Sequence, residues 1–366
     1  MQADERPLAN RSRVRSPVRR ERGERYLLVM LLAFAASVGL TRFFLEMTGY
    51  PQLGGGGLHI AHVLWGGLIL FAAAIAPLLW SNRWVYPLGA LLAGIGVGLF
   101  IDEVGKFITQ TNDYFFAAAA PIVYAFFLMT VLLYLRVRKP VLRDLRAELY
   151  HVFDGLQEWL DHDLDRKEKA RLRSDLAWIA TQQEDPGWAR LGRVLLEFLD
   201  GETQAAPAPR RGPWTRWLMG SWLRFRGWLT EPRLRAMLLG GMGGLGLVAL
   251  KNPAEVLLAN RFPGFSSWLA ALTAGRHVDM VDTWSLMLTR VSLETLAGGL
   301  LLAGAALLAT RRPRLGVTAG QAALLLMLTT ANLIVFYYEQ FSTMVTAAIQ
   351  LLALLGLVYY RREFLE

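Results

Sequence analysis

Residues 54–80 decide the fold; they read GGGGLHIAHVLWGGLILFAAAIAPLLW. After the four glycines, only His59 and His62 interrupt an apolar run that ends at Trp80. An apolar run of about 18 or more residues is long enough to cross the hydrocarbon core of a bilayer as a helix. The stretch therefore predicts a transmembrane helix that carries two imidazoles three residues apart.

Seven more runs of this kind follow or precede it in the 366 residues, which makes eight in all. They cover about 26–45, 58–80, 86–105, 115–135, 235–251, 288–309, 316–337 and 342–360. With a hydrophobic content of 54%, the chain is predicted to be an all-α integral membrane protein of about eight transmembrane helices.

The basic character of the chain has two interpretations, because a net charge of +9 is typical of both nucleic-acid-binding and membrane proteins. The lysines and arginines lie beside the apolar runs, which favours anionic lipid headgroups as partners and not nucleic acid. The chain has no cysteine, which excludes disulfides, thiolate ligands and a cysteine nucleophile.

The N-terminus resembles a secretory signal, with AFA at 33–35 as a possible cleavage site. The apolar run continues to about Phe44, however, beyond the usual length of about 7–15 residues, which favours an uncleaved first span. Eight arginines lie in 1–25, and further basic segments lie on the same predicted side. The positive-inside rule then predicts cytoplasmic N- and C-termini.

The runs and the basic segments divide the chain into four parts. These are a basic cytoplasmic tail (1–25), transmembrane helices one to four (26–135), a cytoplasmic helical insert (136–234) and transmembrane helices five to eight (235–366).

The two groups of spans resemble each other weakly. When the second and sixth spans are aligned, Gly66 falls over Gly298 and His62 over Glu294. Four spans in each group would make two parallel halves. The other interpretation is that two glycine-rich apolar helices align by chance. The pairs Gly94/Gly98 and Gly240/Gly244 have the GxxxG spacing and predict close helix packing.

The insert is predicted to form a small three-helix unit, which could also bind a protein partner. One helix carries an apolar stripe at steps of three and four: Leu142, Leu145, Leu149, Phe153, Leu156 and Leu160. After a Pro/Ala linker, the segment 214–229 gathers aromatic residues beside three arginines, which is typical of a helix in the headgroup region. Its lipid-interface residues would be Trp214, Trp217, Trp222, Phe225 and Trp228. Packing of this segment against the insert is the alternative.

Four polar residues of the spans lie at one predicted depth. His62 and Asp102 are each 18 residues, or about 27 Å, from the cytoplasmic boundary, and Glu294 and Asn332 are at about 25–27 Å. Other polar residues at this level are Arg42, His59, Glu103, Lys106, Asn112, Asp113 and Arg290. Ionisable groups in a bilayer usually face the bundle interior or a watery cavity, so we expect a polar chamber that opens outward over an apolar floor.

These residues allow several chemistries. His59 and His62 share a helix face, and with Asp102 or Glu103 they could hold a divalent metal such as zinc, manganese, iron or nickel. Alternatively, the imidazoles make hydrogen bonds between helices.

The charged residues have a structural and a functional interpretation too. Lys106 is spaced for local ion pairs with Asp102 or Glu103, and Arg290 is spaced for one with Glu294. The same groups could instead relay protons or bind a charged solute.

The segments GGGGLHIAHVLWGG and GLFIDEVGKFITQTNDYF resemble a group of uncharacterised bacterial inner-membrane proteins over the first four spans. The resemblance implies a polytopic protein of the bacterial inner membrane and no particular activity.

Three functions fit the pattern. The first is transport of a small solute or ion through the chamber, with His59, His62, Asp102 and Glu103 binding the solute or a coupling proton. The second is a membrane-embedded, metal-dependent enzyme that acts on a lipid or envelope substrate, with Glu103 or Asp113 as general base. The third is a scaffold or sensor that signals through the insert.

Overall fold

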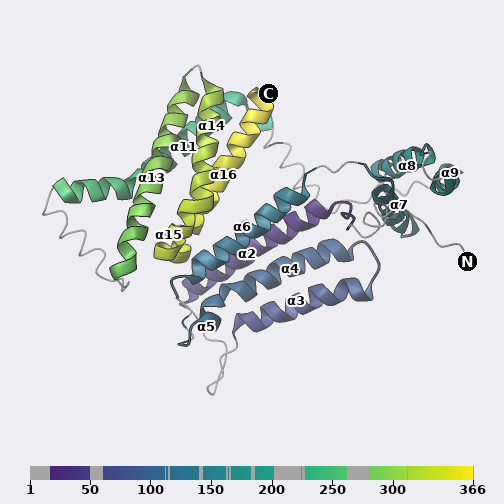
Figure 1. Ribbon diagram of the computed structural model, residues 1–366, viewed down its shortest axis with the longest axis horizontal. Coiled ribbons are helices and arrows are strands. Elements are labelled where there is room, and N and C mark those ends of the chain that lie inside the picture. Colours follow the sequence, from purple (N-terminus) through teal and green to yellow (C-terminus); the bar gives the residue numbers. More distant parts are fainter. Residues whose placement is uncertain are drawn as a thin grey trace, which may run out of the picture. The chain divides into compact units, whose positions relative to one another are not determined.

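The computed structural model is helical, and no β-strand occurs among the residues it describes (Figure 1). These residues are 17–49, 61–111, 113, 116–139, 143–161, 164, 166–182, 186–201, 224, 227–261, 280–310 and 312–365. The helices are α2 (Gly23–Thr48), α3 (His62–Leu79), α4 (Val85–Asp102), α5 (Val104–Ile108), α6 (Ala119–Val137), α7 (Leu145–Leu160), α8 (Arg166–Ala180), α9 (Pro186–Gly201), α11 (Glu231–Arg261), α13 (Met280–Ala309), α14 (Pro313–Leu326), η1 (Met327–Ala331), α15 (Asn332–Glu339), η2 (Gln340–Thr343), α16 (Met344–Tyr360) and η3 (Arg361–Leu365).

Eight segments of the described chain are long and apolar enough to cross a membrane. They are Gly23–Thr48, His62–Leu79, Val85–Asp102, Ala119–Val137, Glu231–Glu255, Ser285–Ala309, Pro313–Glu339 and Met344–Leu365. Many of their large apolar side chains face outward, as lipid-facing residues do; Leu78 is 82% exposed and Leu40 is 68% exposed. The predicted class, an all-α integral membrane protein with eight spans, is confirmed.

The chain forms two compact units. The first contains 1–40, 52–100 and 129–216, and the second contains 41–51, 101–128 and 217–366.

In the first unit, glycines allow close approach between membrane-spanning helices. A Cβ at Gly66 of α3 would lie 2.7 Å from the backbone nitrogen of Phe100 in α4. On α4, a Cβ at Gly98 would lie 2.7 Å from the Cβ of Ser37 in α2, and one at Gly94 would meet the Met30 backbone. The close packing predicted for Gly94/Gly98 is therefore confirmed, with α2 as the partner helix.

The insert contributes α7, α8 and α9, which share a core. Its buried apolar residues are Leu149, Val152, Leu164, Leu172, Leu176, Ile179 and Leu199. The predicted stripe on α7 was wrong in part, because Phe153 is 46% exposed and Leu160 is 68% exposed. The buried side of α7 follows Leu149 and Val152, so Phe153 falls on its flank.

In the second unit, α11, α13, α14 and α16 pack around a common core that includes Met242, Leu301, Leu324 and Leu357. A Cβ at Gly298 of α13 would lie 3.0 Å from the carbonyl oxygen of Gly246 in α11. The close packing predicted for Gly240/Gly244 was wrong within the described residues, because nothing lies within 4 Å of a Cβ at either position.

Two irregularities of the helical backbone lie at residues of the second unit. The helix α4 ends at Asp102, and Glu103 precedes the short helix α5. Between α14 and α15 the backbone widens into the π-helix η1, where the N–H of Asn332 donates to the Met327 carbonyl. Widened turns of this kind are rare in proteins, and those that occur are frequently found at functional sites.

Candidate functional site: buried charges of the spanning helices

Arg42 of α2 and Asp102 of α4 form a buried ion pair in the second unit. Arg42 Nε donates to Asp102 Oδ1 at 2.6 Å, and its Nη2 donates to the Asp102 backbone carbonyl at 2.9 Å. Only 6% of Arg42 and 1% of Asp102 are exposed. The guanidinium carbon also lies 3.7 Å from the centre of the Phe341 ring. Three different segments therefore enclose one arginine.

Glu103 is paired within its own turn. Lys106 Nζ lies 2.6 Å from Glu103 Oε1, and Glu103 is 1% exposed. Of the two local pairs predicted for Lys106, the structure thus contains the one with Glu103, while Asp102 bonds across to Arg42. Asp113 is exposed, and its backbone N–H donates to the Thr109 hydroxyl oxygen at 2.7 Å.

A second network is centred on Arg290 of α13. Its Nε donates to Glu294 Oε1 at 2.8 Å, which confirms the predicted local pair, and its Nη2 donates to Glu339 at the end of α15. Asn252 of α11 donates through Nδ2 to Glu294 Oε2 at 3.1 Å. Glu294 is 6% exposed. Three helices thus supply the groups around Arg290.

The two arginines meet neighbouring residues of one turn. Arg290 bonds to Glu339, the last residue of α15, and Arg42 lies over Phe341 in η2. The α15–η2 turn therefore joins the two charge networks. Because arginine keeps its charge in proteins, each network holds a permanent cation within helices that cross the membrane.

A neutral polar cluster lies beside the π-helix. The Tyr124 hydroxyl donates to the Leu328 carbonyl at 2.5 Å, and Asn332 Nδ2 donates to Gln350 Oε1 at 2.8 Å. The Tyr124 ring stacks on Phe336 with centroids 4.6 Å apart. Gln350 is 2% exposed, so this cluster satisfies polar groups that water does not reach.

The remaining predicted site residues divide into two groups. His62 begins α3 in the first unit and is partly exposed. His59 and Asn112 lie outside the described residues, as do Trp214, Trp217, Trp222 and Phe225. Trp228 is 48% exposed, and the Arg233 guanidinium lies 5.3 Å from its ring centre.

Metal binding stays a prediction. Among the described residues, no three histidine, aspartate or glutamate side chains lie close enough to hold a metal ion. His59, one of the three proposed ligands, is not among those residues, so the set His59, His62 and Asp102 is not tested.

The sequence pattern did not predict that these networks include Asn252, Glu339, Tyr124, Phe341 and Gln350. Each contacts a residue of another helix that is distant in the sequence. Asn332, for example, bonds to Gln350, which is 18 positions away, and to Tyr124, which is 208 positions away. The only sequence signal was the presence of polar residues in or beside apolar runs, which also drew attention to Asn332.

Within the first unit, a third network outside the membrane-spanning segments joins the insert to the residues that flank the spanning helices. Arg83, between α3 and α4, bonds to Glu158 of α7 at 2.7 Å and to Glu21 at 3.2 Å. Arg22 bonds to Glu168 of α8 and lies 3.6 Å from Glu158. Burial raises the pKa of Glu158 to about 7; Arg83 lowers it less than burial raises it, and Glu168 adds to the rise.

Arg22 occupies an unusual backbone position in this network. Its φ of 61° lies in the left-handed region, which is uncommon for a residue other than glycine. The surrounding carboxylates hold the side chain at the start of α2. These contacts offset the backbone cost, because such strain persists only where the neighbouring structure holds it in place.

Comparison with known proteins adds no family to these observations: no family model, no curated protein and no solved structure matches the chain. The chain is therefore described by its own features, as a polytopic all-α membrane protein with charge networks buried in its spanning helices.

Proposed function

We propose that the protein transports a small anionic solute across the membrane, coupled to a proton. The observation that carries this proposal is the convergence of the Arg42 and Arg290 networks on the turn at Glu339 and Phe341. Ionisable residues within membrane-spanning helices are costly, and they typically mark substrate or ion pathways. Both cations and their carboxylates belong to the second unit.

The chemistry follows from the charge balance of each pair. With the carboxylates ionised, Asp102 occupies the donors of Arg42, and Glu294 and Glu339 occupy those of Arg290. Protonation of a carboxylate neutralises it and weakens its bond to the guanidinium. The freed donors suit the planar oxygens of a solute carboxylate or phosphate. Return of the proton to water restores the internal pair and releases the anion.

Uptake by proteoliposomes tests the proposal. The assay would compare a panel of radiolabelled small carboxylates and inorganic phosphate, with and without an inward proton gradient. We expect at least one anion to enter above the level of empty liposomes, several-fold faster with the gradient. Arg290→Gln and Arg42→Gln should each abolish this uptake. Arg190→Gln, at an exposed position of α9, is the matched control and should leave it unchanged.

Two results would contradict proton-coupled anion transport. One is uptake that never exceeds empty liposomes for any member of the panel. The other is uptake that persists in folded Arg42→Gln and Arg290→Gln proteins. Circular dichroism and elution as a single species would establish that each variant is folded.

The proposed orientation places both termini and the insert in the cytoplasm of a bacterial inner membrane. The support is the concentration of cations at the insert end of the spans, including Arg22, Arg83 and Arg138. Because the chain has no cysteine, single cysteines report accessibility without background. We expect Thr111→Cys, and not Ser174→Cys, to react with a membrane-impermeant maleimide in intact cells; the reverse pattern would overturn this orientation.

A second candidate function is a scaffold or sensor, favoured by the bonds that Arg22 and Arg83 make to α7 and α8. Through these bonds the insert could respond to changes in the spanning helices. This role predicts a protein that co-purifies with the whole chain and is lost when 143–201 is deleted. Retention of the same partner by the deleted protein would exclude the insert as its binding site.

A further inference from the structure

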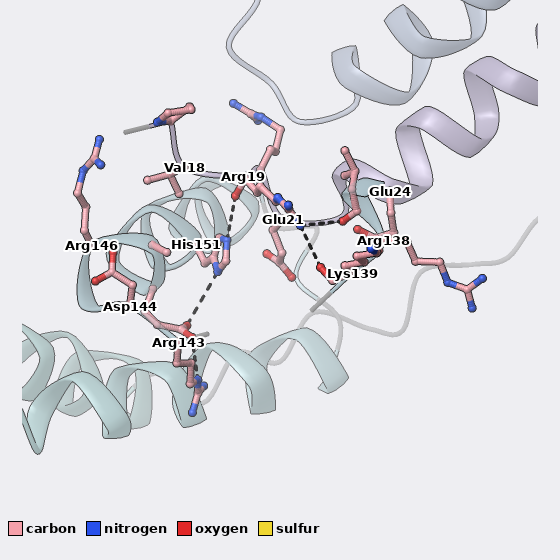
Figure 2. Close-up of a pocket in the computed structure, with 15 residues that line it drawn as sticks. Val18, Arg19, Glu21, Glu24, Arg138, Lys139, Arg143, Asp144, Arg146 and His151 are labelled. Carbon is pink, nitrogen blue, oxygen red and sulfur yellow. Dashed lines mark hydrogen bonds and ion pairs between the residues drawn. The ribbon is translucent and has the colours of Figure 1, made fainter. Parts of the chain in front are cut away.

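The first unit contains a cavity of about 580 Å³ at the insert end of its spanning helices (Figure 2). The cavity lies between the segment before α2, the end of α6 and the start of α7. Its charged walls come from Arg19, Arg20, Glu21, Glu24, Arg138, Lys139, Arg143, Asp144, Arg146, Glu148 and His151. This volume is within the range of about 300–1,000 Å³ that small-molecule sites occupy.

Some of these charges are already paired. Arg143 donates to Glu148 at 2.7 Å and to Asp175 at 2.6 Å, as Figure 2 shows in part. Arg20 lies 3.8 Å from Asp154. These bonds leave less of the negative wall to oppose an anion, because Glu148 is occupied by Arg143.

Two other cations of the wall make no ion pair with a carboxylate of the described residues. Arg138 and Lys139 are exposed, and neither side chain bonds to another residue of the described chain. Arg19 is held in place by its donation to the carbonyls of Val137 and Lys139 at 3.2 and 2.9 Å, which closes the C-terminal end of α6. Arg19 is thereby held against the end of α6, where Arg138 and Lys139 also line the cavity.

The position of this group indicates the kind of anion. Arg138 and Lys139 directly follow Val137, where a membrane-spanning helix ends. Cations in the first residues beyond a spanning helix lie at the depth of the lipid headgroups and attract anionic lipids.

We propose that this cavity binds the headgroup of an anionic phospholipid whose phosphate is followed by hydroxyl groups, as in a glycerol headgroup. Arg19, Arg138 and Lys139 bind the phosphate, because guanidinium and ammonium groups make charge-assisted hydrogen bonds to its oxygens. The carboxylates of Glu24 and Asp144 line the same cavity and accept hydrogen bonds from the hydroxyls. The inference is independent of the transport function, because it concerns other residues in the other unit.

Lipid-dependent thermal stability of the purified full-length protein tests the proposal. The probes are phosphatidylglycerol, phosphatidylcholine of the same chain length, and soluble glycerol 1-phosphate. We expect phosphatidylglycerol to raise the Tm by several degrees and phosphatidylcholine to raise it much less. Arg138→Gln/Lys139→Gln should reduce the gain from phosphatidylglycerol by at least half.

The matched control is Arg190→Gln/Arg193→Gln, which removes the same charge from exposed positions of α9 away from the cavity. This variant should retain the full gain in Tm. Native mass spectrometry provides a second readout, and we expect the wild type and the control to retain more phosphatidylglycerol than the cavity variant.

Three outcomes would overturn the proposal. Equal gains in the cavity and control variants would show that charge alone attracts the lipid. A gain from phosphatidylcholine equal to that from phosphatidylglycerol would show that the cavity does not recognise the headgroup. Stabilisation by glycerol 1-phosphate as large as that by the lipid would assign the cavity to a soluble phosphate compound.

Discussion

In the second unit, Arg42 bonds to the carboxylate of Asp102, whereas in the first unit Arg22 and Arg83 share Glu21, Glu158 and Glu168. The first arrangement lies within spanning helices and pairs a buried cation with a buried anion. The second lies outside them and shares its carboxylates among several guanidinium groups, those of Arg22, Arg83 and Arg171. Burial is the largest cause of the raised pKa of Glu158; Arg83 and Arg22 lower this pKa, while Glu168 and Glu21 raise it.

The difference shows how the surroundings decide which charge arrangements are stable. Within a bilayer no water solvates an unmatched ion, so each carboxylate needs donors from the protein. At a protein–water boundary, protonation and solvent accommodate an excess charge at lower cost. The same residue types therefore form a matched pair in one unit and a titratable cluster in the other.

We expect the largest loss of stability when one member of the Arg42–Asp102 pair is removed. Asp102→Leu leaves Arg42 buried without its carboxylate, and we expect a loss of about 3–5 kcal/mol in stability. The double variant Arg42→Met/Asp102→Leu removes both charges and should recover most of that loss. Chemical denaturation in detergent micelles measures both.

Transport separates the structural role of this pair from its functional role. The double variant should be folded and yet inactive in uptake, because it lacks the groups proposed to exchange a proton and an anion. A double variant as unstable as Asp102→Leu would show that packing around Phe341, and not the unmatched charge, dominates.

In the first unit, we expect the stability of the insert to depend on pH through Glu158. Because the pKa of Glu158 is raised to about 7, its proton stabilises the folded insert fully below the ordinary pKa of 4.5, and this stability is lost as pH rises through 7. We expect this loss of stability to be about 1–2 kcal/mol. The value is smaller than the full change in the pKa of Glu158 implies, because nearby water screens the cluster.

Hydrogen exchange of α7 and α8 between pH 5 and pH 8 measures this loss, after correction for the intrinsic exchange rate. Protection should fall with rising pH in the wild type. In Glu158→Gln the decrease in protection should be smaller, by about the 1–2 kcal/mol expected for Glu158. The raised pKa of Asp175, caused first by burial and then by Glu148, contributes a residual change of the same sign. An unchanged profile in Glu158→Gln would assign the pH effect to other groups.

The neutral cluster should show the smallest effect of the three. Tyr124→Phe removes the hydroxyl that donates to the Leu328 carbonyl at the π-helix, and we expect a loss of about 1 kcal/mol. The ring contact with Phe336 remains. Denaturation under the conditions used for the charge pair gives the value, and a loss as large as that of Asp102→Leu would contradict the distinction between neutral and charged groups.

Much of the fold follows from local sequence properties. All eight spans were predicted, because a run of about 20 apolar residues is itself the physical requirement for crossing a bilayer. The ion pairs of Arg290 with Glu294 and of Lys106 with Glu103 were also predictable, since residues three or four apart share a helix face.

Helical spacing did not predict correctly which residues are buried against neighbouring helices. Phe153 and Leu160 have the period of a buried stripe on α7, but both are exposed, because the partner helices cover the side that holds Leu149 and Val152. Likewise, Gly240 and Gly244 have a helix-packing spacing but no atom close enough to need a missing side chain.

The sequence by itself determined the membrane class, the positions of the spans, the helical insert and which polar residues lie in apolar surroundings. Only the tertiary structure decided that Asp102 bonds to Arg42, that Glu339 and Asn252 complete the Arg290 network, and that cations around the end of α6 line a cavity. Apolar length and helical spacing act within one segment, so they are visible in the order of residues. Partners on different helices depend on how those helices pack, and no periodicity within one helix records that choice.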